Sequence, residues 1–260
     1  MRIQKCFVLP SNQYWASVDV QDIVWICLVV AGASATQAIS GFGFALIAVP
    51  LLSLFIEPQI AVVLATVVGA FSSTFQAVTD RRHAQKELVQ RLAISAYIGM
   101  PFGLLVFIVV SESVLRFIVG VVVLIASIAL MRGFSIPNTN KKLDWMMGWA
   151  SGVLATSTST NGPPLVFLLQ AKKLNPESFR ASINIVFSLT SFGAILLFAV
   201  SGNITPDDFA GIAISVPMLL IGLAIGFKVR SRINAEQFRI LVFALLIVSA
   251  LSALSAAVLA

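Results

Sequence analysis

Two polar breaks, marked by glycine and proline, interrupt an otherwise hydrophobic sequence. The first reads Ser-Gly-Phe-Gly-Phe at residues 40–44, and the second is a run of six polar residues at 156–161 followed by Gly-Pro-Pro. A bilayer core contains no water to satisfy free backbone N–H and C=O groups, so non-helical backbone at membrane depth is packed in protein or lines a cavity. Breaks at corresponding places in two halves of a chain therefore indicate a transporter's binding site.

The composition is that of a membrane protein. Hydrophobic residues make up 58% of the 260 residues and charged residues 11%, whereas a soluble domain has about 25% charged residues. Six of ten apolar segments are long enough to cross a hydrocarbon core of about 30 Å. The segments beside the breaks are shorter, which predicts a hairpin of two partial helices at each break. The ten segments are 22–38, 44–56, 59–79, 88–110, 113–131, 143–155, 163–170, 177–200, 207–227 and 237–259.

The basic residues predict which connections face the cytoplasm. Fourteen of the seventeen lie within residues 81–91, 132–142, 172–180 and 228–239. By the positive-inside rule these connections are cytoplasmic, which places both termini on the outer side of the membrane, the periplasmic side in a bacterial inner membrane. The net charge of +6 therefore reflects membrane topology, and we expect no nucleic-acid partner. The sequence leaves open whether the protein forms a homodimer.

This topology predicts two inverted repeats. The first hairpin begins and ends outside, the second begins and ends inside, and three spans follow each, so the second half is inverted relative to the first. The expected fold is an all-α polytopic membrane protein in which each repeat is a broken-helix hairpin plus three transmembrane helices. Similar residues recur in the same order, including Pro50 with Pro164 and Pro58 with Pro176. The alternative is that membrane helices share Gly, Pro and Ser in any case. The expected parts are an N-terminal tail at 1–21, repeat 1 at 22–131, a cytoplasmic linker at 132–142 and repeat 2 at 143–260.

The helices that follow the breaks provide the ingredients of an anion site. Each begins with free N–H groups and the positive end of a helix dipole. Gly41 and Gly43 allow close approach of backbone to a ligand, Asn161 is a favourable N-cap, and Pro163 suits a first helical turn. The alternative is that both breaks are kinks that allow tight packing. The residues that we predict to bind substrate are Gln37, Ser40, Gly41, Phe42, Gly43, Phe44, Thr66, Gln76, Ser159, Thr160, Asn161, Gly162, Pro163 and Asn184.

Two polar helix faces are expected to point toward the tips of the two hairpins. Thr66, Gly69, Ser73 and Gln76 recur at three- and four-residue steps, and Asn184, Ser188 and Ser191 form a second such face. Small polar residues also join membrane helices without any other role, and for Ser73 and Ser188 both interpretations stay open. The larger amides favour a functional role because leaving them unpaired in lipid is costly.

The residue types that are missing also limit the function. No ionisable residue falls clearly in the centre of a segment, which favours a neutral, dipole-lined site for a small anion. No cluster of histidine, cysteine or acidic residues indicates a metal site or a nucleophile, so we expect neither a cofactor nor an enzyme. The sequence does not separate a carrier from an anion channel.

The motifs Gly41-Phe42-Gly43-Phe44, Arg81-Arg82-His83 and Asn161-Gly162-Pro163-Pro164 resemble the sulfite exporter TauE/SafE family. The resemblance extends from about residue 32 to the C-terminus. It implies a small bacterial inner-membrane permease that moves sulfite, an organosulfonate or another small anion, here by alternating access around the two broken-helix tips. Many members have a glycine-richer signature in the second half, where this sequence has Thr158-Ser159-Thr160-Asn161.

Overall fold

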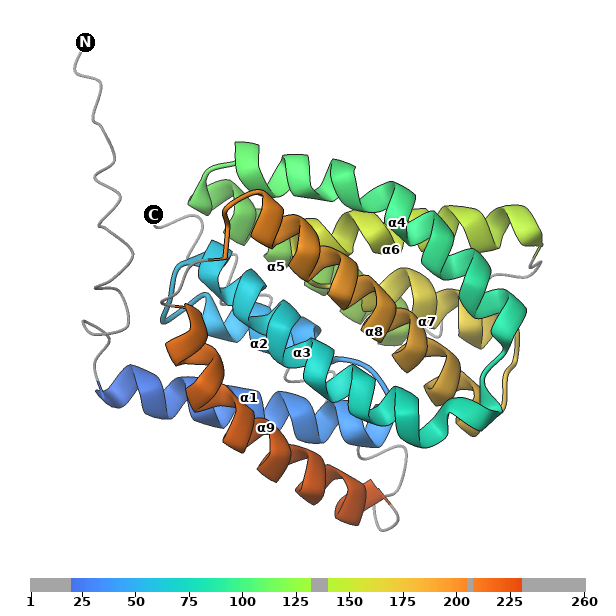
Figure 1. Cartoon of the computed structure of the whole chain (residues 1–260), viewed down its shortest axis with the longest axis horizontal. Coiled ribbons are helices and arrows are strands. Elements are labelled where there is room, and N and C mark those ends of the chain that lie inside the picture. Colours follow the sequence, from blue (N-terminus) through green and yellow to red (C-terminus); the bar gives the residue numbers. More distant parts are fainter. Residues whose placement is uncertain (1–19, 132–139, 205–207, 231–260) are drawn as a thin grey trace.

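The computed structural model describes residues 20–131, 140–204 and 208–230, and within these ranges every regular element is a helix (Figure 1). The all-helical prediction is thereby confirmed. The elements are α1 (Val20–Ser40), α2 (Phe44–Leu52), α3 (Pro58–Asp80), the 3-10 helix η2 (Arg81–His83), α4 (Lys86–Val109), α5 (Glu112–Met131), α6 (Lys141–Ser157), α7 (Gly162–Ala171), α8 (Pro176–Val200) and α9 (Asp208–Arg230).

Five helices in the described part of the chain are long and apolar enough to cross a membrane, namely α1, α3, α4, α8 and α9. The two helices that follow the breaks are short, with 9 residues in α2 and 10 in α7. The prediction that α1 is a partial helix is wrong, because its 21 residues span about 31 Å at 1.5 Å per residue. Its polar C-terminal turn is also helical, and its hydroxyls bond back to the helix, as when Ser40 Oγ donates to the Thr36 carbonyl at 2.8 Å.

Two described helices begin near predicted part boundaries. Helix α6 begins at Lys141, two residues before the predicted start of repeat 2, and α1 begins at Val20, two residues before the predicted start of repeat 1. The predicted tenth segment, 237–259, lies outside the described residues.

The helices pack as three pairs. The most extensive contacts join α4 with α6, α1 with α9, and α3 with α8. In Figure 1, α3 and α8 lie side by side in the middle of the molecule, with α4 and α6 along one side and α1 and α9 along the other. The central pair is joined by a hydrogen bond of 2.8 Å between the Thr74 and Ser188 hydroxyls.

The short helices α2 and α7 lie in two separate apolar cores. Leu46, Val49 and Leu52 of α2 are buried in a core that also includes residues of α1, α3 and α5. Leu165 and Leu169 of α7 are buried in a second core with residues of α4 and α8. Each broken segment is therefore enclosed by protein, as membrane-depth irregular backbone requires.

Glycines allow α4 and α6 to cross closely. Gly99 and Gly103 of α4, and Gly148 and Gly152 of α6, each form a Gly-x-x-x-Gly pair. A Cβ added at Gly152 would overlap the backbone carbonyl of Ala96 on α4. Small residues at such positions let two helix backbones approach within van der Waals distance, which is the main source of helix association in lipid.

Replacing Gly152 by alanine should therefore destabilise the protein, although alanine is the better helix former by about 1 kcal/mol. Inserting a methyl group into a filled contact costs about 1–3 kcal/mol. The matched control is Gly32→Ala on α1, where an added Cβ meets nothing within 4 Å. Thermal unfolding in detergent should show a lower midpoint for Gly152→Ala and an equal or higher one for Gly32→Ala. Equal effects of both changes would contradict the close crossing.

Charged residues join several helices at one end of the molecule. Asp144, which is 1% exposed, pairs with Arg91 Nε at 3.1 Å and with Lys172 Nζ at 2.8 Å. We call these three residues the Asp144 cluster. It brings together the beginnings of α4 and α6 and the end of α7, so both arms of the second hairpin return to the same end. His83 and Glu177 form a further pair, at 3.6 Å between Nε2 and Oε2.

The two arms of the first hairpin also meet, here through an aromatic contact. The rings of Trp25, near the beginning of α1, and Phe55, just after α2, stack with their centroids 5.9 Å apart. The two arms of this hairpin therefore also return to a common end.

Candidate functional site

Both breaks contain backbone in the left-handed region. In the first break Gly41 has φ 86° and Gly43 has φ 99°, and Gly43 is the N-cap of α2. In the second break Ser159 has φ 58°, and Asn161 is the N-cap of α7. Glycine adopts such angles without steric cost, whereas a serine there is uncommon. The structure therefore holds Ser159 in a conformation that costs energy locally, as is frequent in binding sites.

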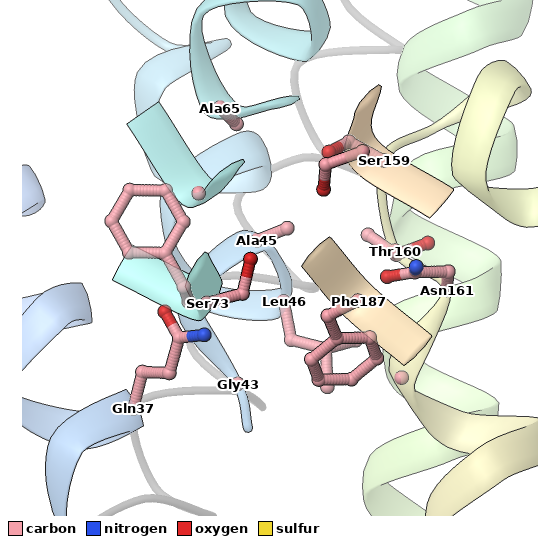
Figure 2. Close-up of a pocket in the computed structure, with 14 residues that line it drawn as sticks. Gln37, Gly43, Ala45, Leu46, Ala65, Ser73, Ser159, Thr160, Asn161 and Phe187 are labelled. Atoms are coloured by element: carbon pink, nitrogen blue, oxygen red, sulfur yellow. The ribbon is translucent and has the colours of Figure 1, made fainter. Parts of the chain in front are cut away.

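A small cavity of about 40 Å³ lies between the two breaks (Figure 2). Its volume exceeds the 10–15 Å³ or so that one water requires. Figure 2 shows Gln37 and Ser73 on one side of the cavity and Ser159, Thr160 and Asn161 on the other. The lining residues are Gln37, Gly43, Phe44, Ala45, Leu46, Ala65, Gly69, Ser73, Ser159, Thr160, Asn161, Gly162, Phe187 and Ser191.

The polar part of the lining is electrically neutral. It consists of the amides of Gln37 and Asn161 and of four hydroxyls. Among the described residues that line the cavity, none has an ionisable side chain. The described lining thus offers no imidazole, thiolate or carboxylate, the side chains that most often bind metal ions in proteins.

Backbone N–H groups add positive potential to this neutral lining. Phe44, Ala45 and Leu46 form the first turn of α2, whose N–H groups have no acceptor within the helix, and all three line the cavity. Helix α7 contributes less, because Pro163 and Pro164 have no N–H group. Two helix beginnings at one cavity favour an anion through their dipoles.

A buried amide network lies directly behind the cavity. Gln37 accepts a hydrogen bond from Ser72 Oγ at 2.7 Å and donates to Asn184 Oδ1 at 3.5 Å. Gln76 Nε2 donates to Ser72 Oγ at 3.3 Å. Of the predicted residues, Gln76 and Asn184 therefore support Gln37 and do not line the cavity themselves.

Thr66 has a similar supporting position at the second break. Its hydroxyl donates to Ser159 Oγ at 3.0 Å. This bond connects α3 of the first half to the break of the second half, and it holds the side chain of the residue with the unusual φ angle.

Four other predicted residues lie outside the cavity lining. The Ser40 hydroxyl bonds within its own turn, Gly41 packs against the side chain of Arg180, and Phe42 packs edge-on against Phe179. Pro163 is buried in the first turn of α7. The other seven predicted residues line the cavity, and they are Gln37, Gly43, Phe44, Ser159, Thr160, Asn161 and Gly162.

The prediction that the Asn161 side chain caps α7 is wrong. Its Nδ2 donates to Thr190 Oγ1 on α8 at 3.0 Å, and no side-chain cap bond is formed. The reason is the backbone of Asn161, which has helical angles of −72° and −3°, whereas a capping side chain needs an extended residue. Thr160 is engaged elsewhere too, since its hydroxyl pairs with that of Thr158 at 2.6 Å.

Seven lining residues were not in the predicted set. Gly69, Ser73 and Ser191 belong to the two polar helix faces, so their periodic spacing could have identified them. Leu46 and Phe187 form the apolar wall of the cavity together with Phe44, which was predicted. Nothing in the local sequence distinguishes Phe187 from the many lipid-facing aromatic residues. The other two residues that the sequence did not indicate are Ala45 and Ala65.

Comparison with known proteins gives one family. The sequence model of the family described as "Sulfite exporter TauE/SafE" matches residues 26–253, a range that includes both breaks. The chain is similar to a protein of Cupriavidus necator named "Probable sulfite/organosulfonate exporter TauE", with 25% identity over 218 residues, or 81% of this chain and 85% of the relative. No solved structure matches the chain.

Proposed function

Because the chain belongs to the sulfite exporter TauE/SafE family, we propose that it is a secondary transporter of a small oxyanion, sulfite or an organosulfonate. The lining of the cavity supports this most strongly. All side chains that line the described cavity between the two breaks are neutral, and the residues of the first turn of α2 form part of that lining. Such a site binds an anion by hydrogen bonds and helix dipoles, as transporters do at broken helices. A fixed cation is not needed to hold the substrate, which favours release after each cycle.

We propose further that the two halves are inverted repeats. The N-caps of the short helices, Gly43 and Asn161, are 118 residues apart, and so are Pro58 and Pro176, which begin α3 and α8. Pro50 and Pro164 are not equivalent in this register, because Pro50 lies deep in α2 and Pro164 in the first turn of α7.

The packing of the helices supports the same register. Helix α1 packs on α9 as α6 packs on α4, while α2 contacts α1 and α3 as α7 contacts α6 and α8. Such a pattern is expected when one unit occurs twice around a pseudo-two-fold axis.

The contacts at the breaks suggest how alternating access would work. Each half supplies a residue that holds the other half's break: Thr66 of α3 bonds Ser159, and Asn184 of α8 bonds Gln37 beside the first break. The cavity lies between the two halves, and the mechanism that we propose requires these halves to move relative to each other. Rocking of one unit against the other would open it first to one side of the membrane and then to the other.

The orientation that we propose follows the positive-inside rule. The end with the Asp144 cluster and the basic connections faces the cytoplasm of a bacterial inner-membrane protein, with both termini in the periplasm. A cysteine introduced at Arg82 should then react only with a reagent applied to the cytoplasmic face, and one at Asn203 only with a reagent on the periplasmic face. Labelling of both from one face would contradict the topology.

Counterflow in proteoliposomes tests the transport mechanism. A carrier that alternates around one site exchanges substrate, so unlabelled sulfite inside the vesicles should accelerate the uptake of labelled sulfite. An anion channel with the same cavity has no obligatory conformational cycle and shows no such trans-stimulation. Uptake that is independent of internal sulfite would therefore overturn the carrier mechanism, and no saturable sulfite flux at all would overturn the proposed substrate.

A further inference from the structure

A second, larger hollow lies at the basic end of the molecule and shares no lining residue with the cavity between the two breaks. It has a volume of about 590 Å³ and lies where α3 gives way to α4, against α8. We call it the basic groove. Its lining includes the side chains of Arg81, Arg82, Lys86 and Gln90, with Val89 and Ile185 as its apolar part.

The cations of the basic groove are available to a ligand. Arg81, Arg82 and Lys86 are all exposed, and no ion pair found among the described residues involves any of them. Asp80 and Glu87, the acidic residues nearest to these cations in the sequence, do not line the groove, and neither does Glu177 in the first turn of α8. Glu87 pairs with Arg91, and Glu177 pairs with His83. The groove therefore concentrates three positive charges without an acidic residue in its described lining.

An apolar surface continues from the basic groove along α4 and α8. Ile94 and Tyr97 follow Gln90 on one face of α4, and Leu189 and Phe192 follow Ile185 on one face of α8. These four side chains are 38–55% exposed. The two faces adjoin each other, because the Tyr97 hydroxyl donates to the Leu189 carbonyl at 2.7 Å.

We propose that the basic groove binds the phosphate of an anionic phospholipid from the leaflet at this end of the molecule. Basic side chains above an exposed apolar strip match a lipid with a negative headgroup and acyl chains, and basic hollows between membrane helices are suited to such headgroups. Inorganic phosphate or the transported oxyanion shares the headgroup's charge but would leave the apolar strip without a role. The site is separate from the central cavity and does not depend on the proposed transport function.

The test compares two lipids on the purified full-length protein by native mass spectrometry, with dioleoyl phosphatidylglycerol as the anionic probe and dioleoyl phosphatidylcholine as the zwitterionic one. The wild type should bind phosphatidylglycerol more tightly. The Arg81→Gln/Arg82→Gln variant should lose roughly thirtyfold in affinity for it, because each basic group near an anionic surface contributes about a fivefold factor. Binding of phosphatidylcholine should not change.

Matched variants separate the groove from general charge. Lys141→Gln/Lys142→Gln removes two exposed charges at the start of α6, outside the groove, and should leave phosphatidylglycerol binding as in the wild type. Arg81→Lys/Arg82→Lys keeps the charges and should retain most of the binding. Equal losses in the two double glutamine variants would overturn the proposal, as would full displacement of phosphatidylglycerol by inorganic phosphate, which would identify a site for a free oxyanion.

Discussion

Replacing Asp144 by alanine should lower the free energy of unfolding by about 3 kcal/mol, the largest stability effect that we expect from a single side chain in this protein. Asp144 is buried and forms ion pairs with two cations, so its removal leaves Arg91 and Lys172 without the counter-charge that they share. Breaking a buried ion pair on one side typically costs about 3–5 kcal/mol. We expect the lower limit because the side chains of Arg91 and Lys172 are 25% and 19% exposed and can turn toward water.

The control is Glu177→Ala, which removes the carboxylate of an exposed pair. The side chains of His83 and Glu177 are 54% and 65% exposed, and such pairs contribute at most about 1 kcal/mol. Chemical or thermal unfolding in detergent measures both variants. A second variant, in which Asp144, Arg91 and Lys172 are all replaced by leucine or methionine, should recover much of the lost stability, because no unpaired charge is left. Equal unfolding of Asp144→Ala and Glu177→Ala would contradict a structural role for the Asp144 cluster.

Much of the fold follows from local chemistry that a sequence displays. Gly43 directly precedes α2, and Pro163 lies in the first turn of α7. Both helices begin within one residue of the predicted positions. A proline at the first position likewise marks the start of α3 and of α8. The extent of α1 was not predictable in this way, because its polar last turn resembles a loop until its hydroxyls are seen bonded to the helix itself.

The candidate site was predictable where it is made of backbone and small polar groups. It was not predictable where partners from distant segments decide a side chain's direction. Asn161 is a residue type that is common at N-caps, yet its side-chain amide donates a hydrogen bond to Thr190, 29 residues later in the sequence. Phe187 lines the cavity only because α3 and α8 pack against each other. Such contacts depend on tertiary packing, which local propensity does not contain.

Replacing Asn161 by aspartate should abolish the binding of sulfite. The change keeps the size of the side chain, and Thr190 can donate its hydroxyl to the new carboxylate, so the fold is retained. A negative charge on the lining of a cavity of about 40 Å³ lies close to any bound anion. Like charges about 4 Å apart repel by roughly 4 kcal/mol in a partly buried setting, which corresponds to at least a hundredfold loss of affinity.

Gly43→Ala provides an independent change at the other break. Its φ of 99° is unfavourable for any residue with a Cβ, although the added atom would have room, 3.7 Å from Thr36 Cγ2. The strain should turn the first N–H groups of α2 away from the cavity. Gly202→Ala is the matched control, because Gly202 has φ 75° with nothing within 4 Å of an added Cβ, in the connection after α8.

Calorimetric titration of sulfite into the purified protein tests most directly whether the two breaks form the anion site. The wild type, Gly202→Ala and Asn203→Asp should bind sulfite with equal affinity. Asn203→Asp places the same new charge in the connection after α8, outside the cavity lining. Asn161→Asp should show no measurable binding, and Gly43→Ala should bind roughly five- to thirtyfold more weakly, which corresponds to a strain of about 1–2 kcal/mol at one backbone position. If the wild type binds sulfite and both cavity variants bind it equally well, the anion site lies elsewhere in the protein.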